Sequence, residues 1–547
     1  MREAPILKRR FLFGLFLAGS VVASSRLERA RAAEAVPLTA DDVNRIVTQA
    51  AAEAQRVGLR AHVAVTDADG NVLAVFRMTG APDTSVVAGT PGQGLEGLSL
   101  PASLVAITKA GSGAFLSSGS SAGGNAFSTR TASFIVQEHF PPAIDFTPGG
   151  PLFGVQFSSL ICTDFKRPPL PLGVSGDPGG LPLYKDGVLA GGIGVEGDRS
   201  YGADTDPRTL DDADDAAAEE QAALAGTRGF EVPELIRANR ILADGIRLPY
   251  VNTQMPPSGA APAPGQYLSA PRATQPSNLV PTTMGDVAGQ RDPRFPTRGG
   301  SVLTAADVTR ILEQAARQTT RTRAAIRQPL GSNARVSIGV VDLDGSVLGF
   351  FQNAEAPNFG IDVSVQKART ANFFSSSTAG DDLRRAGLTR YLTDGLPLDG
   401  SVAYTSRAIG FLSQPLYPPG IENAAEGPFS KPLARDEWSP FNTGLQFDVV
   451  QGALIQVLTT SVVPPTCSAP LPKLANGITI FPGGVPLFKD GRLAGAIGVS
   501  GDGVDQDDLI AWAGSIGFEA PEERRCDRLE IRGTRLPYVK FPRHPEL

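Results

Sequence analysis

The stretch Pro182–Asp198 reads PLYKDGVLAGGIGVEGD, and Pro486–Asp502 reads PLFKDGRLAGAIGVSGD. The two stretches differ at four of their seventeen positions. Each contains two apolar runs on either side of an Asp-Gly pair, and Asp-Gly supplies the positive φ angles of a tight hairpin turn. The pattern therefore predicts the same β-hairpin in two parts of the chain.

The quoted hairpin belongs to a longer repeated unit. Matching segments occur in the same order in both halves: LTADDVNRIVTQAA from Leu38 matches LTAADVTRILEQAA from Leu303, VTDADGNVLAVF from Val65 matches VVDLDGSVLGFF from Val340, and ITKAGSGAFLSS from Ile107 matches VQKARTANFFSS from Val365. A period above about 200 residues indicates duplication of a whole domain and not a solenoid of short repeats. The chain therefore contains two homologous domains in tandem, called copy 1 and copy 2 below.

The two copies share one order of expected elements. A helix at the start of copy 1 places Val43 and Ile46 on one face. It is followed by a hairpin around Asp69-Gly70, by further helices, by a strand through Val155–Ile161, by the quoted hairpin and by a last helix. Because a hairpin pairs its two strands antiparallel, the predicted fold class is α+β: two tandem domains, each an antiparallel β-sheet flanked by helices.

Composition suggests the domain boundaries. We expect an export signal peptide at residues 1–32, copy 1 at 33–252, a Pro-rich linker at 253–299 and copy 2 at 300–547. The linker contains MPPSGAAPAPG and ATQPSNLVP. Such a stretch cannot bury enough apolar surface to fold alone, so we interpret it as a linker or as a strap lying on one domain.

The N-terminus is predicted to be an export signal. The basic Lys8-Arg9-Arg10 precedes the apolar run FLFGLFLAGSVVA, and Ala30-Arg31-Ala32 is an A-x-A cleavage signal, so we expect cleavage after Ala32. The string KRRFLF resembles a twin-arginine signal, with an ordinary Sec signal as the alternative. No later segment has eighteen consecutive apolar residues, so the mature protein is predicted to be soluble and periplasmic or secreted.

Overall composition narrows the classes of function. The 547 residues include 50 Lys and Arg against 56 Asp and Glu, and this net charge of −6 argues against a nucleic-acid-binding surface. The three histidines, His62, His139 and His544, are not repeated between the copies, which disfavours a multi-His metal site in each. Three cysteines form no disulfide framework. Cys162 and Cys467 have nearly equivalent positions, but duplicated positions are usually far apart in space, so a bond between them is not expected.

Gly192, Gly194 and Gly197 form a GxGxxG pattern inside the quoted hairpin. A dinucleotide-binding loop needs this pattern between a strand and a helix. Here the first glycine lies in the second arm of a hairpin, and copy 2 has Ala496 in its place. Small residues that let a helix pack closely on the strand explain the pattern more simply.

Two kinds of cation are repeated in both copies. Lys109 and Lys367 occupy the same place in the middle of a small or apolar helix, and Arg130 and Arg407 also coincide. A cation among apolar neighbours extends to solvent, pairs with a buried carboxylate or meets an anionic ligand. These four residues are the ligand-binding candidates, for a small anionic molecule. Catalytic residues and metal ligands stay unassigned.

The repeated motifs resemble a known family. The segments VQKARTANFF and GGVPLFKDGRLAGAIGVSGDGVDQDD of copy 2, and their counterparts in copy 1, are similar to the GlcG/HbpS-type haem-binding family. The resemblance implies a small antiparallel sheet flanked by helices, homo-oligomeric assembly, and a haem cofactor in an exported protein that senses or degrades haem. Where relatives bind haem through a histidine, this chain has no matching repeated residue, so the alternatives are a histidine in one copy only or a Thr, Tyr or Lys ligand.

Two other classes of function stay open. The repeated Lys and Arg positions are also compatible with an enzyme or binding protein for small hydroxy- or oxo-acids, so enzymatic activity is not decided. Duplication is compatible with a non-catalytic assembly module as well, since tandem copies can reproduce a homodimer interface within one chain.

Overall fold

The computed structural model describes residues 36–541, apart from residues 93, 143, 145–146, 205–216, 260, 422, 433–437 and 469. The expected signal peptide, His544 and most of the acidic segment DTDPRTLDDADDAAAEE (Asp204–Glu220) lie outside the described residues. None of the helices in the described part of the chain has the length and apolar character that a bilayer span requires.

Copy 1 has the expected first helix, both hairpins and the last helix, but not the strand expected through Val155–Ile161. Its elements are α1 (Ala40–Arg56), β1 (His62–Asp67), β2 (Val72–Met78), β3 (Thr84–Val87), β4 (Ser99–Pro101), α2 (Ala102–Phe115), β5 (Ser118–Ser120), β6 (Gly123–Asn125), α3 (Thr129–Ile135), β7 (Gly180–Lys185), β8 (Val188–Glu196), β9 (Ser200–Tyr201), α4 (Ala217–Gly226), β10 (Leu242–Ala243) and β11 (Ile246–Arg247).

Copy 2 repeats the helices and the two hairpins of this order and adds helices of its own, but its described elements include no equivalents of β3–β6 and β9. Its elements are α5 (Ala305–Thr319), β15 (Val336–Val341), β16 (Val347–Asn353), α6 (Phe359–Phe374), α7 (Ala379–Arg385), α8 (Ser406–Leu412), α9 (Leu445–Thr460), β17 (Gly484–Lys489), β18 (Arg492–Gly501), α10 (Val504–Gly514), β19 (Glu530–Ile531) and β20 (Thr534–Arg535).

The two copies have the same central sheet. Four antiparallel strands have the order β2-β1-β8-β7 in copy 1 and β16-β15-β18-β17 in copy 2. The registers also agree, because Val63 pairs with Phe76 and Val195 as Ile338 pairs with Phe351 and Val499. The predicted α+β class of two tandem, helix-flanked antiparallel sheets is therefore confirmed.

The quoted stretch forms the hairpins β7–β8 and β17–β18. Asp186 and Gly187 have φ angles of 51° and 75°, as the Asp-Gly turn requires. A Cβ atom at Gly192 would lie 2.0 Å from the carbonyl oxygen of Ala110, and one at Gly194 would lie 2.2 Å from that of Ala106. These glycines let α2 pack directly on the sheet, as the sequence predicted, and they do not form a phosphate-binding loop.

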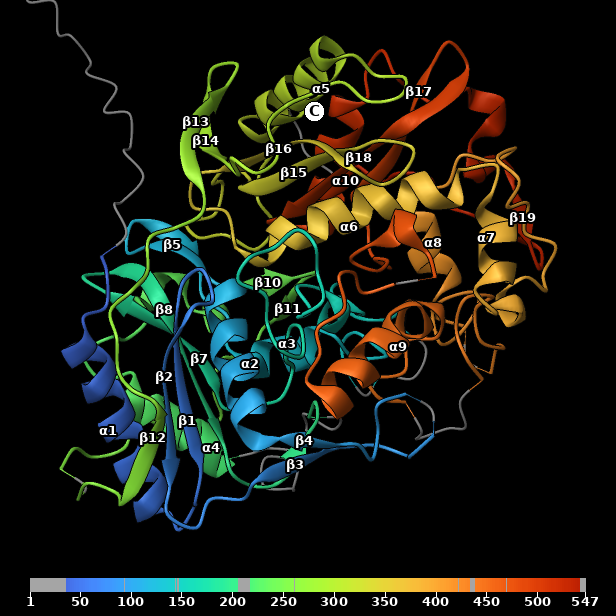
Figure 1. Cartoon of the computed structure of the whole chain (residues 1–547). Coiled ribbons are helices and arrows are strands. Elements are labelled where there is room, and N and C mark those ends of the chain that lie inside the picture. Colours follow the sequence, from blue (N-terminus) through green and yellow to red (C-terminus); the bar gives the residue numbers. More distant parts are fainter. Residues whose placement is uncertain are drawn as a thin grey trace, which may run out of the picture.

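The Pro-rich segment between the copies adds strands to both sheets. Strand β12 (Gly265–Ser269) pairs with β2 at the edge of the copy 1 sheet. The hairpin of β13 (Val280–Met284) and β14 (Val287–Arg291) extends the copy 2 sheet through β16. Figure 1 shows this segment, in yellow-green, running from one sheet to the other. Composition did not predict these strands, because their stability comes from pairing with strands distant in sequence.

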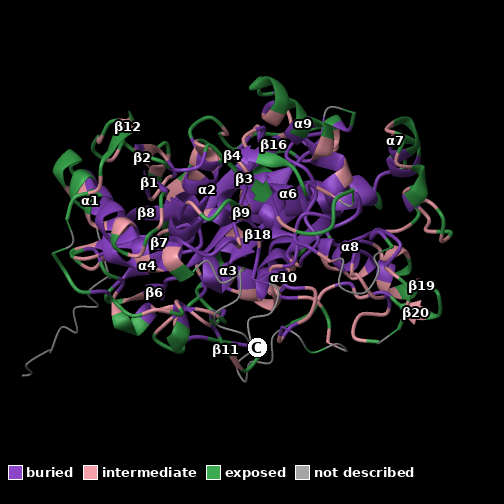
Figure 2. Cartoon of the chain, turned by 90° about the horizontal axis from the view of Figure 1, so that it is seen from below, coloured by how far each residue is buried: buried purple, intermediate pink, exposed green. Residues whose placement is uncertain are grey.

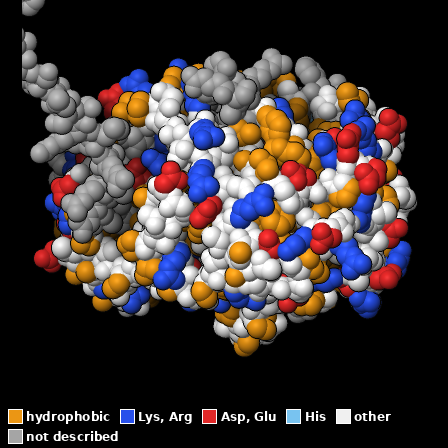
Figure 3. All heavy atoms as spheres, turned by 90° about the horizontal axis from the view of Figure 1, so that it is seen from above, with side chains coloured by type: hydrophobic (Ala, Val, Ile, Leu, Met, Phe, Trp, Pro, Cys, Tyr) orange, Lys and Arg blue, Asp and Glu red, His pale blue; other side chains and the backbone are white. Residues whose placement is uncertain are grey.

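The two copies pack into one body with a shared core. In Figure 1, α6 lies between the copy 2 sheet and copy 1, and in Figure 2 the buried residues run continuously from α1 to α8. Phe359 and Phe481 of copy 2 belong to the core of copy 1, whereas Phe153 and Phe157 of copy 1 belong to that of copy 2. On the surface, positive and negative side chains are interspersed over the face that Figure 3 shows.

The strand expected through Val155–Ile161 is wrong. Residues Val155–Phe157 form a short 3-10 helix instead, and the segment packs against copy 2. Its backbone is satisfied by side chains rather than by a neighbouring strand: Gln446 donates to the carbonyl oxygen of Gly154 at 2.9 Å, and Gln366 donates to that of Phe157 at 3.0 Å. Apolar periodicity cannot distinguish such an interface segment from a buried strand.

The expected separation of Cys162 and Cys467 is also wrong. The two residues form a disulfide, and their Cα atoms are 4.9 Å apart. The disulfide therefore joins the two copies directly where they pack against each other.

We predict that the double variant Cys162→Ala/Cys467→Ala loses about 2–5 kcal/mol of unfolding free energy, because the bond restrains the unfolded chain. Chemical denaturation of oxidised protein measures this loss. Cys526→Ala is the control, since Cys526 is a buried free thiol and its loss removes no cross-link. Equal stability of the double variant and the wild type would contradict the prediction.

Candidate functional site

The predicted Lys109 lies at the centre of a buried acidic cluster in copy 1. Helix α2 places its Nζ atom 2.5 Å from Glu219 Oε2 on α4, 2.7 Å from Glu196 Oε2 on β8 and 3.2 Å from Asp177 Oδ1. Lys109 is fully buried, and the three acidic residues are at most 4% exposed. Copy 1 thus encloses three carboxyl groups around one ammonium group.

The equivalent Lys367 of copy 2 has a different environment. Its Nζ atom donates to Asp507 Oδ2 on α10 and to the carbonyl oxygen of Val499, both at 2.8 Å, and lies 4.9 Å from the centre of the Phe481 ring. In the aligned repeats, Ser500 of copy 2 replaces Glu196, and Phe481 replaces Asp177. In copy 2, the positive charge of Lys367 is therefore compensated by one contacting carboxylate and an aromatic ring.

These environments shift the pKa values of the acidic groups. Burial raises the pKa values of Asp177, Glu196 and Glu219, and their mutual repulsion adds to this shift. Burial opposes the charge of Lys109, but the surrounding carboxylates hold its pKa well above the usual value. In copy 2, burial raises the pKa of Asp507 to about 7.

Three of the copy 1 acidic groups have the spacing of a metal site. One oxygen each of Glu196, Asp198 and Glu219 lies within 4.8 Å of the others. However, Lys109 contacts both Glu196 and Glu219, and the backbone amides of Gly197 and Asp198 donate to Glu219 Oε1. The structure therefore favours a cluster neutralised by lysine and amide groups over a metal centre.

The predicted arginines are also paired with carboxylates. Arg130 Nε lies 2.6 Å from Glu220 Oε2, and Arg407 contacts both Asp508 and Asp505, the latter at 2.6 Å. The structure thus brings Lys109 near Arg130, and Lys367 near Arg407, through adjacent acidic residues on α4 and α10. Sequence reasoning missed these partners, although the doublets Glu219-Glu220 and Asp507-Asp508 occur in both copies after the quoted hairpin.

A separate apolar pocket of about 140 Å³ lies between the two copies. Leu116, Phe127 and Ile135 of copy 1 line it together with Ile326, Phe359 and Phe481 of copy 2. Its other lining residues include Ser500, Asp505 and Asp507, so the pocket adjoins the ion pairs of copy 2. The sequence could not predict this pocket, because its walls come from both copies.

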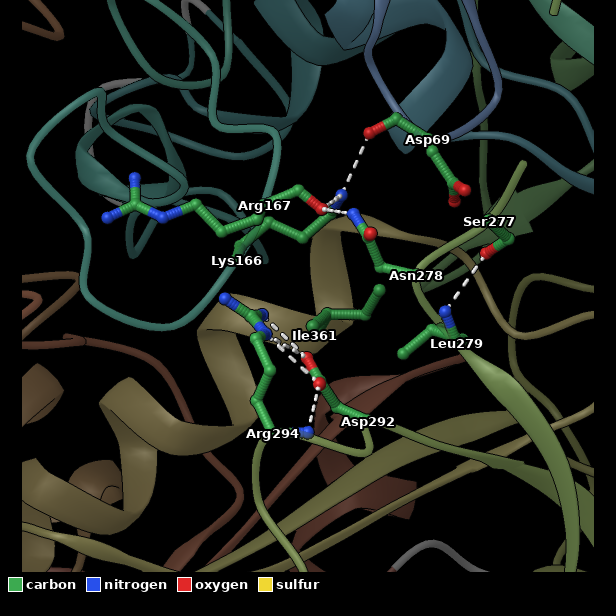
Figure 4. Close-up of a pocket in the computed structure, with 9 residues that line it drawn as sticks. All are labelled: Asp69, Lys166, Arg167, Ser277, Asn278, Leu279, Asp292, Arg294 and Ile361. Carbon is green, nitrogen blue, oxygen red and sulfur yellow. Dashed lines mark hydrogen bonds and ion pairs between the residues drawn. The ribbon is translucent and has the colours of Figure 1, made fainter. Parts of the chain in front are cut away.

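A much smaller cavity lies where the Pro-rich segment crosses both copies (Figure 4). Lys166 donates to the backbone oxygen of Asp69 at 2.8 Å, and Arg294 pairs with Asp292 at 2.6 Å. Burial lowers the pKa of Lys166 to about 8. The cavity volume of about 10 Å³ is that of a single water molecule, so this place is not a ligand site.

The two described histidines differ in accessibility. His62 lies in β1, is 3% exposed, and has Nε2 2.9 Å from the carbonyl oxygen of Pro82, and burial lowers its pKa. His139 follows α3 and is half-buried, with Nδ1 2.7 Å from the carbonyl oxygen of Thr147.

Comparison with known proteins supports the family resemblance. Residues 38–88 in copy 1 and 442–515 in copy 2 match the family model HbpS-like, described as haem degrading protein HbpS-like. The resemblance to the HbpS-type family predicted from the sequence is thereby confirmed, with one matching segment in each copy. No curated protein matches the chain.

Three solved structures are similar to parts of the chain. A PduOC:heme complex is 20% identical, covers 36% of this chain and 97% of its own, and has a TM-score of 0.23. The Klebsiella pneumoniae protein ORFY is 19% identical, with coverages of 40% and 90% and a TM-score of 0.21. A double mutant of Streptomyces reticuli HbpS is 18% identical, with coverages of 42% and 99% and a TM-score of 0.19.

We predict that Lys109→Met destabilises the protein by at least about 3–5 kcal/mol, because it leaves buried carboxylates without their counter-charge. Denaturant unfolding measures this change. Lys185→Met is the matched control: Lys185 pairs with Asp42 at 2.7 Å but is 23% exposed, so its loss should cost less than about 1 kcal/mol. Equal effects of the two substitutions would refute the structural role of Lys109.

We also predict that Glu196→Gln has little effect on stability near the usual glutamate pKa of about 4.5 and stabilises the protein increasingly as the pH rises above it. The raised pKa means that the folded state holds protons that the unfolded state releases, so wild-type stability is lost as pH rises through the folded value. Melting temperatures across this pH range test the prediction, with the exposed Glu523→Gln as control. If the melting temperatures of the variant and the wild type differed by the same amount at all pH values, titration of Glu196 would be excluded as the cause.

Proposed function

We propose that this chain is an exported haem-binding protein of the HbpS-like type. The observation that carries the proposal is the match to a family model described as haem degrading, with one matching segment in each copy. The disulfide between Cys162 and Cys467 supports export, because such bonds persist in oxidising compartments such as the periplasm.

The pocket between the copies does not fit haem. None of its described lining residues is a His, Cys, Met, Tyr or Lys, so it offers the iron no such axial ligand. Its volume of about 140 Å³ is also below the range of about 300–1,000 Å³ in which larger organic ligands bind.

His139 fits the role of an axial ligand better. Hydrogen bonding of one ring nitrogen to a backbone carbonyl is the usual arrangement of a metal-ligating histidine, because it fixes the tautomer that leaves the other nitrogen free. His139 Nδ1 has this contact with Thr147, which directs metal binding to Nε2. The packed rings of Phe134 and Phe140, with centres 5.7 Å apart, lie close to His139 in the chain. Bound haem would supply redox or oxygen chemistry that these residues lack.

The alternative of a small hydroxy- or oxo-acid ligand at Lys109, Arg130, Lys367 and Arg407 is less favoured. Each of these cations already contacts protein carboxylates, and the lysines are fully buried. An anionic ligand would have to displace those carboxylates. Under the proposed function, the ion pairs of these four residues hold α2, α3, α6 and α8 against neighbouring elements.

Titration of the mature protein with hemin tests the proposal. We expect a shifted Soret band that saturates near one haem per chain, and His139→Ala should weaken binding about tenfold or more and change the spectrum. His62→Ala is the control, because it removes the other described histidine, which is buried in β1. No spectral shift in the wild type would overturn haem binding, and unchanged binding by His139→Ala would overturn the assigned ligand.

A further inference from the structure

The loop that holds His139 folds back onto the end of α3. The amide of Phe140 donates to the carbonyl oxygen of Pro148, and the amide of Gly150 donates to that of Gln137, both at 2.9 Å. The carbonyl group that contacts His139 Nδ1 belongs to the same loop. Its position therefore depends on how this loop is held in place.

Copy 2 has the same loop after α8, but without the histidine. Its backbone pairs in the same way, since the amide of Tyr417 donates to the carbonyl oxygen of Ala425 at 2.8 Å. In the aligned repeats, Leu416 takes the place of the histidine, and Glu426 takes the place of a glycine. The two loops thus share a backbone arrangement and differ in these side chains.

That glycine, Gly149, connects the loop of copy 1 to copy 2. Its amide donates to Gln414 Oε1 of copy 2 at 3.0 Å. A Cβ atom at Gly149 would lie 2.8 Å from the same oxygen, so the contact needs a residue without a side chain. Gln137, the counterpart of Gln414 in copy 1, instead donates to the carbonyl oxygens of Ser133 and Asp204 in its own copy. The bridge made by Gln414 therefore supports the loop that carries the histidine.

This bridge affects which ring nitrogen of His139 is free. The carbonyl oxygen of Thr147 accepts a hydrogen bond from Nδ1 at 2.7 Å, so the neutral ring carries its proton on Nδ1 and keeps a lone pair on Nε2. A metal-ligating histidine is usually oriented by such a contact. Gly149 lies two residues after Thr147 in the chain. The hydrogen bond from its amide to Gln414 therefore restrains the carbonyl group that orients the ring.

We propose that Gln414 of copy 2 is a positioning residue for His139 of copy 1. It holds Gly149 and, through it, the carbonyl oxygen of Thr147, so that the histidine presents Nε2 to the haem iron. This inference rests on the proposed ligation of haem by His139. It makes the ligand of one copy depend on the packing of the other copy against it.

Nitrogen NMR of the histidine rings in the full apoprotein, at a pH where His139 is neutral, tests the proposal without haem. The wild type should hold His139 almost entirely as the Nδ1–H tautomer. Gln414→Met removes the acceptor, and Gly149→Ala displaces it with a Cβ atom, so both should raise the share of the Nε2–H tautomer. Gln414→Glu keeps an acceptor oxygen and should retain the tautomer of the wild type.

Hemin titration of the same variants provides the second measurement. Gln414→Met and Gly149→Ala should weaken binding about tenfold or more and change the Soret band, because outer partners of a ligating histidine have effects of this size. Gln414→Glu should bind as the wild type does. Gln328→Met is the matched control: Gln328 is also half-buried and also bridges the copies, donating to the carbonyl oxygen of Arg240 at 2.8 Å. It should leave both measurements unchanged.

An unchanged tautomer in Gln414→Met and Gly149→Ala would overturn the proposal. Equal effects of Gln414→Met and Gln328→Met would also overturn it, because any loosening of the contact between the copies would then explain the result. Circular dichroism spectra and melting temperatures close to those of the wild type establish that the variants are folded. If the wild type binds no hemin, the proposed function fails, whereas the tautomer in the apoprotein still decides whether Gln414 orients His139.

Discussion

The contact between helix α6 of copy 2 and segment 153–168 of copy 1 is the interaction on which the rest of the structure depends. The fully buried Asp362 accepts the amide of Ser159 at 2.7 Å and the hydroxyl of Thr163 at 2.6 Å, and Arg369 pairs with Asp164 at 2.7 Å. Neither copy can satisfy these groups alone, and leaving a buried charge unpaired is costly. The disulfide, the shared core and the apolar pocket all follow from this contact.

The local features of the fold could be predicted from the sequence. The Asp-Gly hairpins, the first helix and the role of Gly192 and Gly194 depend on neighbours close in the chain or on repetition between the copies. The ion pairs of Lys109 and Arg130 could not be predicted, because their acidic partners lie 68 or more residues away in sequence. The strand expected through Val155–Ile161 failed for the same reason: its apolar residues face the other copy and not a neighbouring strand.

Duplication has allowed the two copies to diverge at equivalent positions. Copy 1 concentrates carboxyl groups around Lys109, whereas copy 2 has Ser500 and Phe481 where copy 1 has Glu196 and Asp177. Copy 2 has the shorter Asp507 where copy 1 has Glu219, and both carboxylates keep the ion pair with the buried lysine. A homodimer would carry each of these changes in both subunits, whereas a tandem chain can carry them in one copy only.

Differential scanning calorimetry of the oxidised chain tests most directly whether the two copies form one body. If the α6 contact makes each copy depend on the other, the chain should unfold in a single transition whose calorimetric and van't Hoff enthalpies agree. Two separable transitions, each with about half of the total enthalpy, would contradict this account, because they would mean that the copies fold independently and that the pocket between them is only a loose contact.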